Sequence, residues 1–531
     1  MKIEKIIAEL ELTDLAGQVL CYDIYDKDNP DDVEKVISQI RPGALYLDNM
    51  SREKIKMYTD MANKYTKIPV AIVTDVEFGP GENMSGLPVL PNVMAWSACD
   101  DEELVERAAE IMAKICRLHG IAWTLSPVVD INMNFNNPLV NVRSASDSPE
   151  QVKKIMSAFM RGISKNGYMV STLKHFPGDG VDDRNQHFCT TVNSLPMPEW
   201  RKTFGEVYKY MISQGADAVM CAHIGLPAYA GEGDESGAVS AVLSKPLMTD
   251  LLKGELGFNG CIISDAMSMV GSAARVDLDK LAVTFLNCGG DMVLFNEPED
   301  HGLIVRAAEN GSLPLERLKD AVSRVLRIKK KARLFENEND VLSEITESKA
   351  ELIKQLEEIG DKIAERSIKF VRNTEGLLPL NIKPGSKFLC VEIGDSETDA
   401  TAIYDELKSR GYEVKVCRNI GHNELAIIMN DYDCVLINCF FIGKHGGTMR
   451  SGWGQIAPFW RGYLLKHPCV VFTSFGDPYK LYDYPFLKTY VNTFSYTQSS
   501  MRAFVRVLLG EAKMTAKNPV SLKGYFERET C

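Results

Sequence analysis

The sequence of 531 residues lacks several features that mark common protein classes. No run of 18 apolar residues occurs, and acids interrupt the apolar positions of the first twenty residues. We therefore expect neither a membrane span nor a secretory signal peptide. Lysine and arginine number 60 against 72 aspartates and glutamates, which gives a formal net charge of −12. A chain this acidic is a poor general nucleic-acid binder, because neutralising phosphates needs a basic surface.

Motifs for metal and nucleotide chemistry are missing as well. The chain has no C-x-x-C pair, no H-E-x-x-H, no G-x-x-x-x-G-K-[ST] loop and no convincing G-x-G-x-x-G. Its 13 cysteines are an odd number and stand mostly in apolar runs such as "DCVLINCFF". This usage predicts reduced, buried thiols in a cytoplasmic protein without a metal or cofactor. The oligomeric state does not follow from the sequence.

What the chain does contain is an alternation of apolar β-type runs with helical patterns over residues 1–340. Such alternation predicts repeated βα units and a parallel sheet. An early run, "AGQVLCYD", brings the expected strands to eight, which favours a (β/α)8 TIM-like barrel. The other seven runs are residues 42–47, 70–75, 121–127, 168–175, 216–223, 260–265 and 291–295.

Polar residues end several of these runs, and they favour the barrel over the competing doubly wound open sheet. The strand ends are Asp75, Lys174 with His175, His223 and Asp265. In a barrel all strand C-termini open onto one face, so these side chains would converge. In an open sheet they would be spread along a line.

The remainder of the chain predicts a second α/β domain. Residues 341–370 carry apolar positions at helical spacing and are expected to form one long helical linker. Residues 371–531 are expected to form an α/β sandwich. Its predicted strands are residues 387–394, 413–419, 433–441 and 468–476, and residues 499–511 are predicted to form a helix.

The segment "LKHFPGDGVDDRNQHF" (173–188) concentrates chemistry at one predicted strand end. Lys174 and His175 cannot both enter the same packed core, since an unpaired buried ammonium is costly. The Pro-Gly-Asp-Gly turn then leads into a loop with His187. That histidine is either a surface residue or a general acid and base, a role for which its ordinary pKa is suitable.

Three further positions each admit two interpretations. Asp265, in "GFNGCIISDAMSM", is either a helix N-cap or a nucleophilic carboxylate at a barrel mouth. Asp75 and Glu77, in "TDVEFGPG", either form an Asx turn or face a pocket. Arg143, in "NVRSASD", is either a surface arginine or part of the site.

These motifs together resemble glycoside hydrolase family 3, most closely its bacterial β-N-acetylglucosaminidase branch. The similarity runs over nearly the whole chain, from "LELTDLAGQVL" through "DVEFG", "SPVVDI", "VRSASDSPE" and "KHFPGDG" to "GFNGCIISDAMSM". It continues in "ERSIKFVRNTEGLLPL" and "VVFTSFGDPYKL". The resemblance implies a barrel followed by an α/β sandwich, and retaining hydrolysis of a terminal β-linked sugar.

By position, the resemblance also implies roles for single residues. Asp265 matches the nucleophile, and His187 matches the unusual loop histidine that serves as acid and base in this branch. Four residues match positions that bind the sugar: Asp75, Arg143, Lys174 and His175. The implied substrate is a terminal N-acetylglucosamine or related hexose.

The chain departs from the branch at positions that affect the substrate more than the reaction. Asn185 stands where an aspartate usually orients the loop histidine; a neutral amide can bond the ring but cannot favour its charged form. Asp179 replaces a second histidine of the turn, "EFG" replaces Glu-Gly-Gly, and Asn83 replaces an arginine.

Three alternatives follow from these departures. The chain could be a glycoside phosphorylase, because Asn185 places less negative charge beside an incoming phosphate. It could be a β-glucosidase or β-xylosidase, in which a second-domain Glu is the acid; none is evident in the glycine-rich segment 443–455. That segment, with Trp453, either covers the barrel mouth or is a plain surface loop. Finally, it could be a sugar-binding protein that has lost catalysis.

Overall fold

The computed structural model describes residues 2–233, 237–273, 275–394, 398–441, 443 and 448–529, without side chains for 272 and 273. The chain divides into two compact units. The first unit contains residues 2–89, 105–131 and 152–356, and the second contains 90–104, 132–151 and 357–529. Each unit has its own sheets and its own core.

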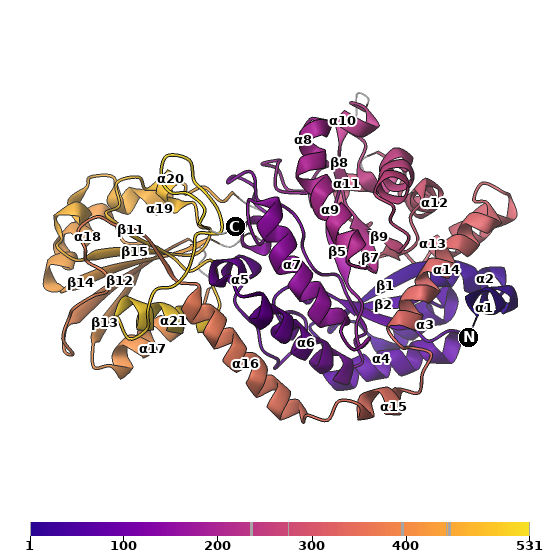
Figure 1. Ribbon diagram of the computed structural model, residues 1–531, viewed down its shortest axis with the longest axis horizontal. Coiled ribbons are helices and arrows are strands. Elements are labelled where there is room, and N and C mark those ends of the chain that lie inside the picture. Colours follow the sequence, from indigo (N-terminus) through magenta and orange to yellow (C-terminus); the bar gives the residue numbers. More distant parts are fainter. Residues whose placement is uncertain are drawn as a thin grey trace. The chain divides into compact units, whose positions relative to one another are not determined.

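The first unit is built on parallel strands (Figure 1). One sheet has five strands in the order β10-β1-β2-β3-β4, a second has three in the order β5-β7-β9, and β6 pairs with β8. Isolated parallel bridges join Trp123 to Val170 and Ile263 to Met292. The strands are β1 (Leu20–Tyr25), β2 (Ala44–Asp48), β3 (Ala71–Thr74), β4 (Trp123–Thr124), β5 (Thr172–Phe176), β6 (Thr191–Val192), β7 (Ala218–Cys221), β8 (Ile224–Gly225), β9 (Cys261–Ser264) and β10 (Val293–Leu294).

Helices alternate with these strands and begin at recognisable signals. The helix after β1, for example, has Pro30 at its first position, and its N-cap Asn29 accepts a hydrogen bond from the Asp31 N–H at 2.9 Å. The longer helices in this part of the chain are α1 (Ile3–Glu9), α2 (Leu12–Gln18), α3 (Pro30–Ile40), α4 (Arg52–Tyr65), α6 (Glu102–Leu118), α7 (Pro149–Ser164), α8 (Met197–Lys202), α9 (Phe204–Ser213), α12 (Leu278–Cys288), α13 (Asp300–Glu309), α14 (Leu315–Lys331) and α15 (Glu338–Ser343). The shorter ones are α10 (Pro227–Ala230), α11 (Val270–Ala273), the 3-10 helices η1 (Pro80–Glu82) and η3 (Ala241–Leu243), and the π-helix η4 (Pro246–Glu255).

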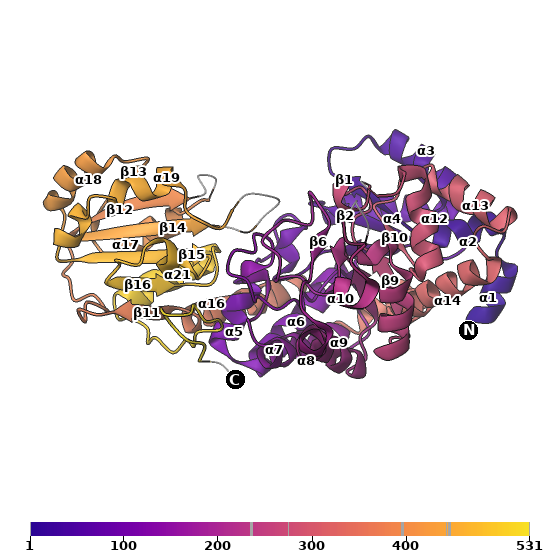
Figure 2. The same cartoon turned by 90° about the horizontal axis from the view of Figure 1, so that it is seen from above.

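The second unit has a six-stranded sheet in the order β11-β16-β15-β14-β12-β13 (Figure 2). All neighbours are parallel except β11 and β16, which pair antiparallel. Its strands are β11 (Lys369–Asn373), β12 (Lys387–Gly394), β13 (Glu413–Arg418), β14 (Cys434–Phe441), β15 (Val470–Gly476) and β16 (Thr489–Asn492). Its helices are α5 (Val93–Cys99), η2 (Asn141–Arg143), α17 (Thr401–Ser409), α18 (His422–Ile428), η5 (Met429–Asp431), α19 (Trp453–Ile456), η6 (Ala457–Phe459), η7 (Tyr463–Lys466), α20 (Lys480–Asp483) and α21 (Gln498–Leu508).

Both faces of this sheet are buried. Successive side chains along a strand point to opposite faces, so neighbouring residues of one strand pack in different cores. On β12, Phe388 and Cys390 pack in a core with residues of α17 and α21. Leu389 and Val391 pack in a second core that includes residues of α5 and α18. Two apolar layers on one sheet are typical of an α/β domain whose sheet is covered on both sides.

The predicted strands compare closely with the observed ones. Each of the eight runs expected in residues 1–340 contains a strand, and so does each of the four expected later. β11 and β16 were not predicted. The long helix expected over 341–370 is wrong in extent: α16 spans Lys349–Arg366. The Ser348 hydroxyl accepts the Glu351 N–H at its start, and β11 begins shortly after its end.

The compact units do not follow the contiguous division at residues 340 and 370. Segments 90–104 and 132–151 belong to the second unit although the first unit flanks them in sequence. Throughout the described part of the chain, no helix is both long and apolar enough to cross a membrane. A cytoplasmic location remains a prediction.

Candidate active site

Asp75 and Lys174 meet directly at the ends of β3 and β5. The Lys174 ammonium donates to Asp75 Oδ1 at 2.5 Å and forms an ion pair with Glu77 Oε1 at 2.8 Å. The Tyr46 hydroxyl, from β2, donates to Asp75 Oδ2 at 2.9 Å. The Lys174 side chain is only 4% exposed, so its two carboxylates compensate a charge that would be costly if buried alone.

A third carboxyl group completes this cluster. Glu82 Oε1 accepts the N–H groups of Phe78 and Gly79 at 2.7 and 2.9 Å and so fixes the turn after β3. Burial, and then the neighbouring Glu77 and Asp75, raise the pKa of Glu82 well above its usual value. The cluster therefore combines the Lys174 ammonium with Glu82, a carboxyl group that resists ionisation. Asp75 provides a hydrogen-bond acceptor next to Lys174.

His175 has a different partner. Its Nδ1 lies 2.6 Å from Asp130 Oδ2, and its backbone N–H donates to Asp130 Oδ1 at 3.1 Å. The same Oδ1 accepts the Asp179 N–H at 2.8 Å, so Asp130 also holds the turn that follows. Both Lys174 and His175 are buried. This is compatible with the cost of buried charge because each has a carboxylate of its own.

Asp265 follows β9 and lies among histidines. Its backbone N–H donates to Cys221 O at 2.7 Å, and its Oδ1 accepts the Ala266 N–H at 2.8 Å. Burial raises the pKa of Asp265, but nearby imidazoles and the Ala266 N–H lower it more, so the net pKa lies below its ordinary value. The three imidazoles, in order of decreasing effect, belong to His223, His175 and His187. Asp265 is thus a partly exposed carboxylate that is held in its ionised form.

His223 ends β7 and is fully buried beside Asp265. Its Nε2 lies 3.0 Å from Ala266 O, so Nε2 carries the proton that it donates to this carbonyl. Burial lowers the pKa of His223 more strongly than Asp265 and the carbonyl raise it. A neutral His223 therefore fixes the backbone next to Asp265.

His187 is oriented by Asn185. Asn185 Oδ1 lies 2.7 Å from His187 Nδ1 and also accepts the His187 backbone N–H at 3.0 Å. An atom that accepts a backbone N–H is the amide oxygen, so Nδ1 of the ring is the donor. This assignment leaves His187 Nε2 as the nitrogen that can give or take a proton.

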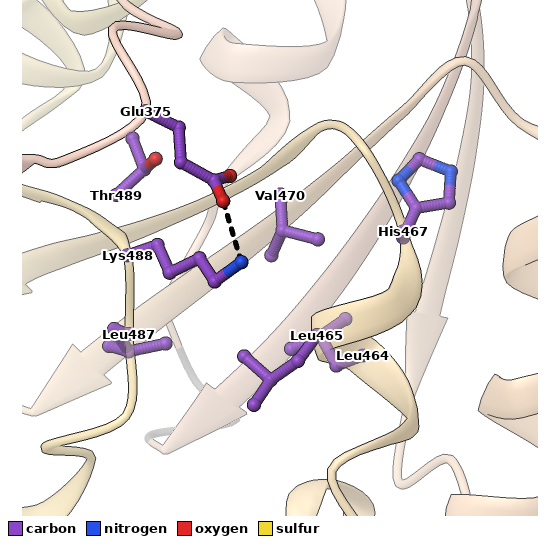
Figure 3. A pocket seen from close by; sticks show the side chains of 8 residues that line it. All are labelled: Glu375, Leu464, Leu465, His467, Val470, Leu487, Lys488 and Thr489. Atoms are coloured by element: carbon purple, nitrogen blue, oxygen red, sulfur yellow. Dashed lines mark hydrogen bonds and ion pairs between the residues drawn. The ribbon is translucent and has the colours of Figure 1, made fainter.

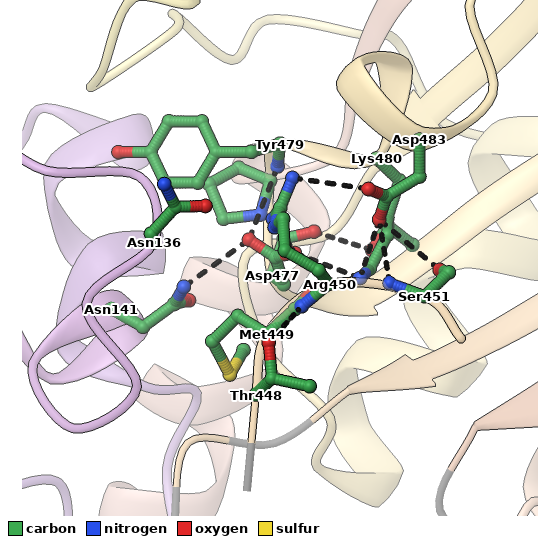
Figure 4. Close-up of polar contacts among 12 residues, drawn as sticks. Asn136, Asn141, Thr448, Met449, Arg450, Ser451, Asp477, Tyr479, Lys480 and Asp483 are labelled. Atoms are coloured by element: carbon green, nitrogen blue, oxygen red, sulfur yellow. Dashed lines mark hydrogen bonds and ion pairs between the residues drawn. The ribbon is translucent and has the colours of Figure 1, made fainter. Parts of the chain in front are cut away.

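Arg143 lies on η2 in the second unit, whereas the other predicted site residues lie in the first. Its segment is fixed within the second unit. Asn141 donates to Asp477 Oδ1 at 3.2 Å (Figure 4). Asn132 donates to the Tyr479 hydroxyl at 3.1 Å. The role of Arg143 in sugar binding stays a prediction.

The same close-up shows how the end of the glycine-rich segment is held (Figure 4). Arg450 forms ion pairs with Asp477 at 3.0 Å and Asp483 at 3.3 Å. Lys480, which is fully buried, pairs with the same two carboxylates at 3.1 and 3.2 Å. Residues 442 and 444–447, on which the prediction of a cover over the barrel mouth partly rests, lie outside the described residues.

Three site residues were missed by sequence reasoning. Asp130 stands in the quoted motif "SPVVDI" after an apolar run, the same signal that identified Asp75 and Asp265. Tyr46 is hidden in the apolar strand "GALYL", and a strand pattern gives no sign that its hydroxyl reaches a carboxylate. Glu82 follows a Gly-Pro-Gly turn, where an acid is ordinarily a surface residue.

Comparison with known proteins identifies the family of this chain. The model of the glycosyl hydrolase family 3 N-terminal domain matches residues 3–328. A beta-N-acetylglucosaminidase/beta-glucosidase of Cellulomonas fimi is 28% identical over 98% of this chain and 95% of its own length. A beta-hexosaminidase of Stenotrophomonas maltophilia (strain K279a) is 33% identical over 44% of this chain and 67% of its own.

A solved structure of a beta-glucoside phosphorylase is similar over 98% of this chain and 96% of its own, with 30% identity and a TM-score of 0.89. The family model covers well over half of the sequence, and this relative covers nearly all of it. The resemblance predicted from the motifs is thereby confirmed. This chain belongs to glycosyl hydrolase family 3.

Proposed function

We propose that this enzyme is a retaining exo-glycosidase that removes a terminal β-linked N-acetylglucosamine, or a related hexose, through a covalent glycosyl-enzyme. The observation that carries the proposal is the state of Asp265. Asp265 is only partly buried. Its pKa is lowered, and His187 is among the groups that lower it. A charged nucleophile next to a proton-transferring imidazole is what double displacement requires.

In the first step an Asp265 carboxylate oxygen attacks the anomeric carbon. The bond from that carbon to the leaving oxygen breaks, and the proton on His187 Nε2 passes to the leaving group. In the second step Nε2 takes a proton from water, the water oxygen bonds to the anomeric carbon, and the ester to Asp265 breaks. The hydrogen bond from Nδ1 to Asn185 supports this role, because it leaves Nε2 for both transfers.

Sugar hydroxyls would be held by Asp75, Lys174 and His175 of the first unit; the part of Arg143, which lies in the second unit, rests on the family resemblance alone. The ion pair of Asp75 with Lys174 supports this arrangement, because it pairs an acceptor with a donor at one point. The acetamido preference rests on the names of the relatives, a beta-N-acetylglucosaminidase/beta-glucosidase and a beta-hexosaminidase.

We also propose that eight of the ten parallel strands of the first unit, all except β6 and β8, form a closed (β/α)8 barrel and that the second unit is an α/β sandwich. Two bridges support closure: Trp123 with Val170 joins β4 to the β5 side, and Ile263 with Met292 joins β9 to the β10 side. In a closed barrel Asp75, Lys174 and Asp265 lie on one face, as catalysis requires.

The test replaces Asp265 by alanine and measures turnover of nitrophenyl β-N-acetylglucosaminide, β-glucoside and β-xyloside. We expect a loss of about 1,000-fold or more on the best substrate. The exposed Asp279→Ala variant is the control and should retain wild-type turnover. A 5-fluoro-glycosyl fluoride of the preferred sugar, which keeps the substituent on carbon 2, should add one glycosyl mass to the wild type and none to Asp265→Ala. Near wild-type turnover by Asp265→Ala would refute the assignment.

Phosphorolysis is the second candidate, and one observation favours it. Asn185 Nδ2 is buried, and within the described residues it has no hydrogen-bond partner. This amide could donate to a phosphate oxygen, whereas a carboxylate at the same position would repel phosphate. The similar beta-glucoside phosphorylase agrees with this possibility.

In this variant a phosphate oxygen, in place of water, would attack the glycosyl–Asp265 ester and release the sugar 1-phosphate. The experiment is turnover with and without 10 mM phosphate, with the products identified by phosphorus NMR. Faster turnover together with sugar 1-phosphate would establish phosphorolysis. Unchanged turnover with free sugar as the product would leave hydrolysis.

A further inference from the structure

The second unit has a cavity at the carboxyl ends of β12 and β13. Its volume is about 650 Å³ including the open mouth, and its lining includes Glu392, Arg418, Asn419, Ile420, Gln455 and Pro458. β12 lies between β13 and β14, so the strand order changes direction at this point of the sheet. In open α/β sheets such a switch point is where a crevice forms outside the strand ends and where ligands bind.

Polar groups in this cavity are already neutralised. Glu392 accepts hydrogen bonds from Arg418 Nε and from the Tyr404 hydroxyl. The Arg418 side chain is 52% exposed, which leaves the rest of its guanidinium at the mouth. The amides of Asn419 and Gln455 add uncharged donors and acceptors. The lining therefore offers directional hydrogen bonds without a net charge.

Two exposed tryptophans flank the lining residues Gly454–Pro458 in sequence. Trp453 is 69% exposed and precedes the lining residue Gly454; Trp460 is 52% exposed and follows Pro458 by two positions. Their ring centroids are 6.4 Å apart with an angle of 51° between the planes. The other three tryptophans of the chain are fully buried. Exposed aromatic side chains that lie together are typical of interaction sites.

We propose that this cavity of the second unit, together with Trp453 and Trp460, binds a neutral pyranoside. The apolar C–H face of a pyranose packs on an indole, and its hydroxyls match the amides and the Arg418–Glu392 pair. A nucleotide or phosphate fits less well. Arg418 is already paired with a carboxylate, and the sequence that follows β12, "GDSETD", is acidic and is no glycine-rich cradle. This inference does not depend on the proposed catalytic function.

A second cavity in the same unit lacks these properties (Figure 3). It has about 350 Å³ and lies near the start of β15 and β16. The ion pair of Lys488 with Glu375, at 2.6 Å, lies across its lining. Both ring nitrogens of His467 lie within hydrogen-bond distance of backbone groups of Cys469 and Tyr432. Leucines fill most of the rest. Its polar groups bind one another, so it carries no argument for a ligand.

The tryptophans themselves provide the test. The probes are N-acetylglucosamine and methyl β-glucoside, titrated to 50 mM and followed by the indole N–H signals of ¹⁵N-tryptophan-labelled protein. Trp453→Phe and Trp460→Phe assign the two exposed signals. The titration uses the Lys174→Ala background, in which sugar binding by the proposed active site is disabled. We expect both exposed indoles to shift in a saturable way while the three buried ones stay fixed.

Variants separate a binding site from non-specific contact with sugar. Trp453→Ala and Gln455→Ala should each weaken the affinity at least fivefold, as read from the remaining Trp460 signal. The control is Leu278→Ala, which changes an exposed apolar residue of the first unit and should leave the affinity unchanged. Gln455→Ala keeps the test valid if Trp453→Ala does not fold.

Three results would overturn the proposal: no saturable shift with either sugar, equal shifts of all five indoles, or shifts with ADP or phosphate but not with sugar. A failure here is distinct from a failure of the proposed function. The indole signals report the second unit directly, whereas turnover by the wild type and Asp265→Ala reports the catalytic carboxylate.

Discussion

At the scale of single residues, the groups that lower the pKa of Asp265 are the imidazoles of His223, His175 and His187 and the Ala266 N–H. An ammonium or guanidinium is charged over the whole working range of pH, whereas an imidazole gains its charge only as the pH falls. The electrostatic stabilisation of the Asp265 carboxylate by these imidazoles therefore increases as the pH falls toward the range in which the carboxylate would be protonated. We therefore expect the enzyme to keep its activity down to a low pH.

The first prediction concerns His223→Phe. Phenylalanine preserves ring volume but removes the imidazole that contributes most to lowering the pKa of Asp265. That pKa should rise, so the acid limb of kcat/KM should move to higher pH, with a smaller change on the alkaline side. The measurement is the pH profile of kcat/KM for the best nitrophenyl glycoside.

A matched control exists for this change. His301 is also a buried histidine whose Nε2 bonds a backbone carbonyl, that of Thr13 at 2.9 Å, and burial also lowers its pKa. His301→Phe should therefore leave the shape of the profile unaltered. If both variants shifted the acid limb alike, the effect would be general destabilisation and the role assigned to His223 would fail.

The second prediction concerns Asn185→Asp. A carboxylate that accepts the Nδ1–H bond would favour the protonated imidazole of His187, so the alkaline limb of the pH–rate profile should move upward. The change also removes the buried Nδ2 donor and adds a negative charge. Any acceleration by phosphate should therefore fall at least tenfold.

Asn185→Ala is the comparison for this variant, because it removes the acceptor without adding charge. Its turnover should fall without an upward shift of the alkaline limb. If Asn185→Asp left both the limb and the phosphate response unchanged, Asn185 would not act through His187. Both profiles need only the nitrophenyl assay at a series of pH values.

At the scale of elements, apolar runs predicted most strands because buried parallel strands are nearly continuous in hydrophobic residues. β11 and β16 were not predicted, and the reason is physical. β11 is an edge strand whose residues "KFVRN" are all only partly buried, and β16 has four residues. Neither gives a long apolar run. The two elements pair antiparallel, and a sequence pattern cannot show this when 115 residues separate their ends.

The candidate site could be predicted only in part, for a related reason. Polar residues at strand ends, such as Asp75 and Asp265, interrupt an apolar pattern and are therefore visible. Partners such as Tyr46 and Asp130 are defined by contacts between strands distant in sequence. A buried carboxyl such as Glu82 has the same sequence signal as a surface acid in a turn. Its environment becomes evident only in three dimensions.

The third prediction tests that environment with Glu82→Gln. The amide oxygen can still accept the Phe78 and Gly79 N–H groups, while the buried charge beside Asp75 and Glu77 is removed. A carboxyl with a raised folded-state pKa contributes its stability below the unfolded value, and that stability is lost as the pH rises through the folded pKa. The variant should therefore become more stable than the wild type as the pH rises from about 4.5.

The measurement is urea unfolding at several pH values between 4 and 8. The gap in free energy of unfolding should be absent near pH 4, open as the pH rises and persist to pH 8. Glu103→Gln, which changes an exposed glutamate, should show no such pH-dependent gap. A Glu82→Gln variant that is less stable at every pH would mean that the ionised carboxylate itself is needed.

At the scale of the whole molecule, sequence order and compact units do not coincide. The segments 90–104 and 132–151 lie between parts of the first unit in sequence but supply residues to the core of the second. Met94, Ala95, Ala98 and Val142 are buried in the same cluster as Leu389 and other residues of its sheet. Residues 357–529 alone therefore cannot complete the core of the second unit.

The last prediction follows from that arrangement. A fragment of residues 357–531 retains the strands of the six-stranded sheet but loses the four buried side chains contributed by the two segments. It also loses the Lys517–Asp100 pair at 2.7 Å. Burial of side chains such as Met and Val is worth about 1.5–3 kcal/mol each, and whole domains are stable by only about 5–15 kcal/mol. We expect a fragment with near-native strand content, no near-UV circular dichroism and no cooperative urea transition. The full chain, measured in parallel, should show both the near-UV signal and a cooperative transition. A fragment that unfolded cooperatively and gave a well-dispersed amide spectrum would contradict this prediction. It would mean that the sheet and its own helices form a stable core, and that segments 90–104 and 132–151 pack against a domain that folds without them.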